Sequence, residues 1–442
     1  MASLWRNWTG DQRCAPAEIA EPGSEAELAE VIARARARGL PVRAVGSGHS
    51  FTDIACTDGV MVRLRRMNRL VHADPATGRV RVQAGITLRE LGQRLAEHGL
   101  ALENMGDIDA QTLAGALATA THGTGARYGN LATQVASLRL MTADGLVAEL
   151  SEDDDDRETW LAARVSLGAL GIVTEVELRC VPAFALHRID EPRPLAETLE
   201  RFHSLVEENE HFEFFAMPYT DVAMCRKTNR TEQPPQPRER VAAYVQDVLL
   251  ENRALDLFCR AGRAVPRAIP ALNRRLAGFF SRTELVDRSH RVHPNRRDVR
   301  FTEMEYAVPR EAGPDAVRRI FDLIERRRLT VNFPIEVRAV AADDAFLSPA
   351  HDRPTTYIAV HSYQGMEFES YFRGVEAIMD EHEGRPHWGK RHYQSAPTLR
   401  ERYPRWDSFQ DVRARLDPDG VFANDYTRRV LGPVGAELRA PA

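Results

Sequence analysis

Apolar residues recur at helical spacing in two stretches of the first hundred residues. Residues 24–39 and 87–99 each place apolar side chains three or four positions apart, which puts them on one face of a helix. A hydroxyl residue and a glutamate three positions later open each stretch, as in a capping box, and a glycine closes it. The residues that carry this pattern are Ser24, Glu27, Leu28, Val31, Ile32, Ala35 and Gly39, then Thr87, Leu88, Glu90, Leu91, Leu95 and Gly99. We therefore predict two amphipathic helices.

Short apolar runs between and after these helices predict strands. The runs 42–45, 60–62 and 80–82 are rich in valine and too short for helices. The segments 212–217 and 300–365 supply further apolar runs in the second half of the chain. Because strands and helices mix along the first 180 residues, we predict an α+β fold.

A longer helical stretch, residues 239–281, is interrupted by Pro266 and Pro270. Its basic residues include Arg260, Arg263, Arg267, Arg274 and Arg275. A basic amphipathic helix can lie on a membrane surface. Such a helix more often packs on a domain with its polar face in water. We expect the packed helix and keep peripheral membrane contact as the alternative.

Composition indicates a globular protein of two or three folding units. The chain has 442 residues, 43% of them hydrophobic and 28% charged, and its net charge of −5 gives no indication of nucleic-acid binding. It contains no uninterrupted run of 18 apolar residues, and its first residues lack the apolar core of a signal peptide. The five cysteines form no C-x-x-C pair, which favours a reducing, cytoplasmic location. They are Cys14, Cys56, Cys180, Cys225 and Cys259.

The candidate chemistry begins in a glycine-rich loop, residues 43–51, at the end of the first predicted strand. Gly46 and Gly48 allow the backbone to approach a phosphate with its N–H groups, and His49 lies in the middle of the loop. No lysine follows as in nucleotide-binding loops, and Phe51 stands where a dinucleotide fingerprint has its third glycine. On spacing alone, an ordinary turn with a surface histidine is the alternative.

A second segment, residues 115–125, combines small residues with hydroxyls. Its members are Gly115, Thr119, Thr121, Gly123 and Gly125. Small side chains let backbone N–H groups reach a flavin or a phosphate, and hydroxyls can donate to its oxygens. The alternative is a close crossing of a helix and a strand, which also requires glycines.

These two segments are accompanied, in order, by similar short motifs at 82–85, 166–174 and 387–390. Together they resemble the vanillyl-alcohol-oxidase flavoproteins, and within them the aldonolactone oxidases and the related alditol oxidases. The resemblance covers nearly the whole chain and is clearest in the N-terminal half and near the C-terminus. Several motifs in the right order are more specific than any one of them.

The resemblance implies a domain organisation. It predicts a two-lobed FAD-binding domain of the vanillyl-alcohol-oxidase (PCMH) type over residues 1–183. An α+β substrate domain with an antiparallel sheet would follow over residues 184–415. The last segment, residues 416–442, would return to the FAD-binding domain.

The resemblance also implies the cofactor and its attachment. In this family the histidine matching His49 is bonded covalently to the isoalloxazine ring, whereas relatives without it hold FAD non-covalently. We therefore expect FAD, tethered through His49. The resemblance and the two small-residue segments predict that FAD is bound by Val45, Gly46, Ser47, Gly48, His49, Ser50, Phe51, Asp107, Thr112, Gly115, Thr119, Ala120, Thr121, His122, Gly123, Gly125 and Ile172.

Gly106 and Asp107 resemble the segment that passes the reactive edge of the flavin. In the family, a small side chain at the position of Gly106 can obstruct oxygen, so glycine there implies an oxidase. The alternative is that Gly106 only makes a turn. Asp107 stands where alditol oxidases have a hydroxyl residue, so it is a candidate substrate-binding residue. The same difference puts the binding of a polyol in doubt.

Glu336 and Arg338 lie two positions apart in an apolar run, so on a strand they share one face. They match the Glu-x-Arg of the aldonolactone and alditol oxidases, which implies catalytic roles; a surface salt bridge is the alternative. Lys390 matches the lysine of the family's H-W-x-K motif, where a cation can stabilise reduced flavin; a solvated loop lysine is the alternative. His361 lies near a further substrate-binding position.

Three histidines near the C-terminus, His382, His387 and His392, raise the possibility of a metal site. Their spacing fits neither H-E-x-x-H nor a zinc-finger pattern. The H-W-x-K motif explains this region better, so we expect no metal.

The resemblance implies oxidation of an aldono-1,4-lactone, such as L-gulono-, L-galactono- or D-arabinono-1,4-lactone, at C2. A hydride would pass to flavin N5, and molecular oxygen would be reduced to hydrogen peroxide. The 2-keto product could tautomerise to an ascorbate-like enediol. The alternatives are an alditol oxidase that acts on the terminal carbon of a polyol and a non-catalytic FAD-binding module.

Overall fold

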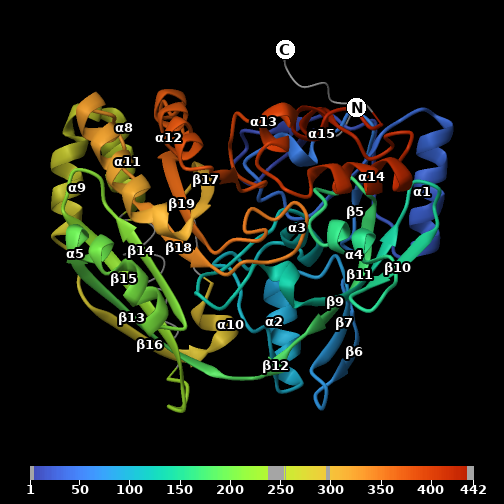
Figure 1. Cartoon of the computed structure of the whole chain (residues 1–442), viewed down its shortest axis with the longest axis horizontal. Coiled ribbons are helices and arrows are strands. Elements are labelled where there is room, and N and C mark those ends of the chain that lie inside the picture. Colours follow the sequence, from blue (N-terminus) through green and yellow to red (C-terminus); the bar gives the residue numbers. More distant parts are fainter. Residues whose placement is uncertain (1–3, 237–252, 254, 295–298, 436–442) are drawn as a thin grey trace.

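The computed structural model describes residues 4–236, 253, 255–294 and 299–435. Two small sheets built from the first part of the chain occupy one half of the molecule, and one large sheet occupies the other half (Figure 1). This is the two-lobed cofactor domain and the α+β domain with an antiparallel sheet that the sequence predicts.

The first lobe is a parallel sheet with a helical crossover. Its strand order is β3-β5-β4, and α1 connects β3 to β4. Ser24 accepts a hydrogen bond from the Glu27 N–H and so caps α1, as predicted. The Glu27 carboxylate accepts from the Gly23 N–H, one residue before the cap. The bounds are β3 (Glu18–Ala20), α1 (Glu25–Ala37), β4 (Val42–Val45), η1 (Asp53–Ala55) and β5 (Val60–Arg63).

The second lobe is an antiparallel sheet of order β10-β9-β11-β7-β6. Helix α2 begins with the predicted capping box of Thr87 and Glu90 and buries Leu88, Leu91 and Leu95. The bounds are β6 (Leu70–Asp74), β7 (Arg79–Gln83), α2 (Leu88–Glu97), α3 (Leu113–Ala118), η2 (Leu131–Gln134), β9 (Val135–Met141), β10 (Val147–Ser151), α4 (Arg157–Ala163) and β11 (Ile172–Arg179). Two short pairs accompany the lobes: β1 (Trp5–Arg6) with β2 (Arg13–Cys14), and β8 (Leu100–Ala101) with β12 (Val181–Pro182).

The large sheet has eight strands in the order β16-β13-β15-β14-β18-β19-β17-β20, all antiparallel to their neighbours. The strands are β13 (Ala185–Pro194), β14 (His211–Ala216), β15 (Val222–Thr231), β16 (Thr283–Arg288), β17 (Phe301–Pro309), β18 (Ile335–Val340), β19 (Thr355–Tyr363) and β20 (Arg385–Pro386). The helices are α5 (Leu195–Glu200), α6 (Phe202–Glu208), α10 (Ser289–Val292), η5 (Arg310–Ala312), α11 (Gly313–Arg327) and α12 (Glu369–Glu381).

The two faces of this sheet differ in chemistry because side chains alternate along each strand. One face is apolar and packs under α5, α6, α11 and α12 through residues such as Phe212, Phe214, Met304, Tyr306, Ile335, Val337 and Ile358. The opposite face carries buried charged groups: Glu213, Glu303, Glu305, Glu336 and Arg338. The charged face is turned to the cofactor domain, so this alternation positions the site.

The predicted helical stretch 239–281 is confirmed only in part. Residues 237–252 and 254 lie outside the described residues. Beyond them, α8 (Leu255–Ala264) ends before the short helix η4 (Pro266–Ala268), as Pro266 predicts. Pro270 does not break the chain: it lies in the first turn of α9 (Ile269–Ala277), where a missing N–H costs nothing. Among the described residues, no helix combines the length and the apolar character needed to cross a membrane.

The C-terminal part returns to the cofactor domain earlier than predicted. The helices are α13 (Ala396–Arg400), α14 (Trp406–Leu416) and α15 (Asp425–Leu431). Buried residues from Trp388 onward, including Leu399 and Phe409, join the same hydrophobic core as Leu28 and Leu91. Figure 1 shows these red helices over the N-terminal lobe. The boundary expected at residue 416 is therefore too late.

Candidate active site

Two adjoining cavities lie where the predicted site residues meet. One, of about 490 Å³, lies within the cofactor domain, and the other, of about 910 Å³, lies between that domain and the charged face of the large sheet. They share His49, Ser50, Gln111 and Thr119 in their walls. The two therefore form a continuous space that is suited to an elongated ligand with one end beside the charged groups.

The glycine-rich loop after β4 forms one wall of the smaller cavity. Gly48 has a φ of 71°, a conformation that favours glycine. A Cβ at Gly46 would collide with the Thr112 hydroxyl, so only glycine fits this close approach to α3. The backbone N–H groups of residues 47–50 make no hydrogen bond with the described part of the chain. Unused N–H groups around a cavity are what a phosphate requires, so the loop fits a pyrophosphate.

Most of the predicted cofactor residues line the two cavities. The smaller one is lined by Val45, Gly46, Ser47, Gly48, His49, Ser50, Thr112, Gly115, Thr119 and Ile172. The larger one adds Phe51, Asp107, Thr121 and His122, and it is also lined by Gly106, the position predicted to admit oxygen. Ala120, Gly123 and Gly125 lie behind these walls. Gly123 packs against Asn104, and the Gly125 N–H donates to the Ala339 carbonyl at 2.7 Å, so these two glycines serve the close packing that we considered as the alternative.

His49 lies at the junction of the two cavities. Its ring stacks on Trp8, with centroids 5.5 Å apart and an angle of 22° between the planes. Burial, together with the positive charge of Lys390, lowers the pKa of His49 to about 4. The imidazole is therefore neutral near pH 7, and a neutral imidazole has the lone pair that a nucleophile needs.

Glu336 and Arg338 are buried, so the surface salt bridge that we considered is wrong. Their exposed fractions are 3% and 7%, and both line the larger cavity. Arg338 pairs with Glu336, and its Nη2 lies 3.3 Å from Asp107 Oδ2. Its Nε donates to Glu213 Oε2 at 2.7 Å. Arg338 is thus fixed by carboxylates from β14, β18 and the loop of Asp107.

Lys390 also lines the larger cavity and is held there by Glu303. Its Nζ lies 2.5 Å from Glu303 Oε2 and 5.2 Å from the centroid of the Phe51 ring. Burial alone would raise the pKa of Glu303, but Lys390 and His361 outweigh it and lower this pKa to about 2. The Glu303 carboxylate is therefore ionised and orients the ammonium group, so Lys390 is not a solvated loop lysine.

His361 lies behind the site rather than in it. Its Nδ1 donates to the Pro334 carbonyl at 3.1 Å, and its Nε2 lies 3.5 Å from Glu303 and 3.9 Å from Glu336. It lines a separate cavity of about 140 Å³. The structure thus gives His361 contacts with two carboxylates of the site instead of the predicted place on the substrate side.

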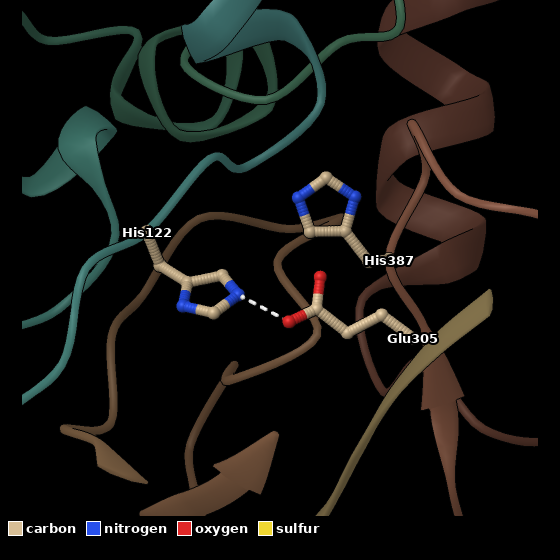
Figure 2. A group of neighbouring side chains, drawn as sticks. All are labelled: His122, Glu305 and His387. Carbon is tan, nitrogen blue, oxygen red and sulfur yellow. Dashed lines mark ion pairs between the residues drawn. The ribbon is translucent and has the colours of Figure 1, made fainter. Parts of the chain in front are cut away.

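Glu305, which was not among the predicted site residues, lies beside His122 and His387 (Figure 2). His122 Nε2 is 3.3 Å from Glu305 Oε1, and the His122 ring stacks on Tyr357 at 3.7 Å. A signal existed: Glu303 and Glu305 alternate within an apolar strand in the same way as Glu336 and Arg338.

The three C-terminal histidines do not converge. His382 ends α12 and lies 3.3 Å from Asp315, whereas His392 pairs with the Tyr426 hydroxyl at 3.0 Å. Only His387 lines the larger cavity. The spacing of these histidines therefore carries no metal site, and the absence of a metal stays a prediction.

Comparison with known proteins identifies the family. The model of the D-arabinono-1,4-lactone oxidase family matches residues 176–430, and that of an FAD-binding domain matches residues 16–151. The chain belongs to the D-arabinono-1,4-lactone oxidase family. It is an FAD-dependent oxidoreductase of the kind that acts on CH–OH groups. An L-gulono-1,4-lactone dehydrogenase of Mycobacterium tuberculosis is 57% identical over 98% of this chain and all of that protein.

More distant relatives carry related names. An L-gulonolactone oxidase of Mus musculus is 34% identical over 97% of this chain and 98% of that protein. An alditol oxidase of a Streptomyces species is 33% identical over 98% of this chain and all of that protein. The fold is that of cholesterol oxidase from B. sterolicum, with a TM-score of 0.83 at 17% identity over 98% of this chain and 97% of that chain.

Proposed function

We propose that the chain oxidises an aldono-1,4-lactone at C2. Support comes from one arrangement: Glu336, Arg338 and Lys390 face the same cavity as the glycine-rich loop and His49. The lactones named for the relatives of this chain carry hydroxyls on a small ring. The charged groups would bind those hydroxyls, while apolar walls such as Phe301 exclude water.

FAD, when bound, supplies a two-electron acceptor at N5. The role of Arg338 is to donate to the oxygen at C2, because its fork is fixed by three carboxylates. The ammonium group of Lys390 stabilises the negative charge that develops on this oxygen and on the atoms next to it. The carboxylate of Glu336 accepts a hydrogen bond from the substrate hydroxyl and so orients its C–H bond.

Covalent attachment through His49 is part of the proposal. A neutral imidazole at the junction of the cavities, stacked on Trp8, would suit bonding to the ring methyl of FAD. A C–H bond of the methyl group would break as the C–N bond forms, the two electrons released would reduce the flavin, and oxygen would reoxidise it. In the variant His49→Ala, acid precipitation should release all the yellow colour into the supernatant. The exposed His72 offers the control variant His72→Ala, whose pellet should stay yellow. If acid precipitation of the wild type releases the colour into the supernatant, the covalent bond between His49 and FAD is contradicted.

Anaerobic reduction tests the substrate class. Purified yellow protein is mixed under nitrogen with L-gulono-, L-galactono- and D-arabinono-1,4-lactone and with polyols such as xylitol. Bleaching of the flavin by at least one lactone, followed by peroxide formation on admission of air, is the expected result. Bleaching by polyols alone supports the alditol oxidase, and no bleaching supports a non-catalytic FAD-binding module.

The proposal that oxygen accepts the electrons from the flavin rests on Gly106, which lines the larger cavity. A Cβ there would lie 2.9 Å from the His122 carbonyl oxygen, so the position has no room for a side chain without a backbone shift. We keep the role of Gly106 in admitting oxygen to the flavin as part of the proposal. A cytoplasmic location also remains a proposal, and its support is that all five cysteines are free of disulfides.

A further inference from the structure

His122, Glu305 and His387 form a buried group on the wall of the larger cavity (Figure 2). They come from three places: the loop after α3, strand β17 and the loop after β20. Each is 4% exposed. Nothing in the proposed chemistry so far uses Glu305 or the ring of His122.

The contacts of the two ring nitrogens of His122 require a proton on the pair that it forms with Glu305. His122 Nδ1 lies 2.8 Å from the Gly123 carbonyl, which can only accept, so Nδ1 carries a proton. His122 Nε2 lies 3.3 Å from Glu305 Oε1. A lone pair on Nε2 cannot face a carboxylate favourably, so one further proton must lie on one of these two groups. The pair thus holds one exchangeable proton.

His387 makes the group unsuited to a metal. Its Nδ1 accepts a hydrogen bond from the Gly389 N–H at 3.0 Å. Burial lowers the pKa of His387 to about 3, so the ring is neutral and its single proton lies on Nε2. A metal on Nε2 would require loss of that proton, and therefore either loss of the Gly389 hydrogen bond or an anionic ring. The group is therefore organised to hold protons rather than a cation.

The pair lies beside the proposed entry of oxygen. The built Cβ of Gly106 would meet the His122 carbonyl oxygen at 2.9 Å and Thr121 Cγ2 at 3.5 Å, and all three residues line the larger cavity. The titratable and charged groups that act on the pair are His387, Tyr357, Lys390, Glu303 and Arg338. Burial would raise the pKa of Glu305, but His122 and Lys390 hold it well below its ordinary value.

We propose that the His122–Glu305 pair donates the proton that completes hydrogen peroxide. This inference rests on the proposed oxidase function. Transfer of a hydride equivalent to molecular oxygen gives the hydroperoxide anion, which needs one proton to leave as hydrogen peroxide. Oxidation of the substrate alcohol releases one proton per turnover, which restores the pair. The sum balances in atoms and electrons: one secondary alcohol and one molecule of oxygen give one ketone and one molecule of hydrogen peroxide.

The test separates the oxygen half-reaction from the substrate. The holoenzyme is reduced with dithionite, without any lactone, and mixed with oxygenated buffer in a stopped-flow instrument from about pH 6 to pH 9. His122→Asn and Glu305→Gln should slow reoxidation at least about tenfold at the alkaline end, the scale of a lost general acid. Added imidazole buffer should restore the rate of both variants in proportion to its concentration.

Glu376→Gln is the matched control. This carboxylate is also buried, but it accepts hydrogen bonds from the Tyr393 N–H and the Tyr306 hydroxyl instead of lining the larger cavity. Its reoxidation rate should equal that of the wild type. The inference is wrong if all the variants have the same reoxidation rate as the wild type. It is also wrong if the reduced flavin of the wild type does not react with oxygen. Failure of every lactone to bleach the flavin rejects only the proposed substrate.

A second readout does not depend on turnover. NMR spectra are recorded near pH 7 on holoprotein whose histidines carry ¹⁵N, and the ring resonances of His122 are identified because they disappear in His122→Asn. These resonances should show both ring nitrogens protonated or sharing a proton with Glu305. A neutral ring with an unprotonated nitrogen, beside an ionised Glu305 in the infrared spectrum, overturns the inference. One equivalent of a transition metal that is present in the wild type and lost in both variants also overturns it.

Discussion

At the scale of single residues, Arg338 shows how the site obtains its geometry. Its guanidinium is buried, and the cost of burying a charge is offset only where partners are placed around it. Glu213 lies directly opposite Arg338 on the neighbouring strand β14, so the register of the sheet supplies one partner. Arg226 pairs with the other oxygen of Glu213 at 3.1 Å. Glu213 is therefore a positioning residue for Arg338.

The variant Glu213→Gln should lower substrate affinity more than it lowers the rate of the bound complex. Arg338 would keep Glu336 and Asp107, but its Nε would face a neutral amide instead of a carboxylate, so KM should rise about tenfold, or about 1.4 kcal/mol, with a smaller fall in kcat. Steady-state kinetics with the active lactone measure this division, and Glu213→Asp should restore part of the affinity. An unchanged KM with a lower kcat contradicts the role.

The sequence predicted some of these residues and missed others for a physical reason. The Glu-x-Arg spacing places Glu336 and Arg338 on one strand face without any knowledge of the neighbours. Glu303 and Glu305 have the same spacing, but two like charges suggest a function only once their partners are known. Those partners, Lys390 and His122, come from distant segments, and only the fold shows the pairing.

At the scale of elements, the short N-terminal hairpin holds the glycine-rich loop from outside. The Trp8 N–H donates to the Gly48 carbonyl at 2.8 Å, and Asn7 Nδ2 donates to the Ser50 carbonyl at 3.1 Å. The hairpin has strands of only two residues, β1 and β2, and so has no periodicity that a sequence pattern could reveal. The longer α1 and α2 were predictable because caps and apolar spacing agree.

The variant Trp8→Ala should lower the fraction of covalently bound flavin. Without the stacked indole, the His49 ring is free to rotate away from the cavity, and misplacement of a reacting group slows its reaction strongly. The flavin that remains in the acid-precipitated pellet measures the effect soon after purification. Leu4→Ala is the control, because Leu4 lies next to the same hairpin with 55% of its surface exposed. Equal covalent fractions in the two variants contradict the role.

At the scale of the whole molecule, the site exists because two domains, each with its own hydrophobic core, face each other. The alternation along β14, β17 and β18 gives the large sheet one apolar and one charged face, and the return of residues 388–431 places Lys390 beside the cofactor loop. The sequence predicted both domains and the order of their motifs. It placed the return too late, because Trp388 and Leu399 are apolar in either domain, and only packing shows which core they join.

Buried ionisable groups make the stability of the whole molecule depend on pH. Burial lowers the pKa of His387 from its ordinary value of 6.5 to about 3, so between these values the unfolded chain binds more protons than the folded one. The free energy of unfolding should therefore fall as the pH falls from 6.5, by up to about 1.4 kcal/mol per pH unit from this group. Glu303, whose pKa Lys390 and His361 lower to about 2 against its burial, adds a loss of the same sign below its ordinary value of 4.5.

Urea denaturation at a series of pH values from about 7 to about 4.5 measures this slope. The variant His387→Asn removes the titrating ring, so its free energy of unfolding should change less steeply with pH than that of the wild type. His72→Asn replaces an exposed histidine and should keep the wild-type slope. A parallel slope in the His387 variant would show that this ring takes up its proton at the same pH in the folded protein as in the unfolded chain, and the lowered pKa of His387 would then be wrong.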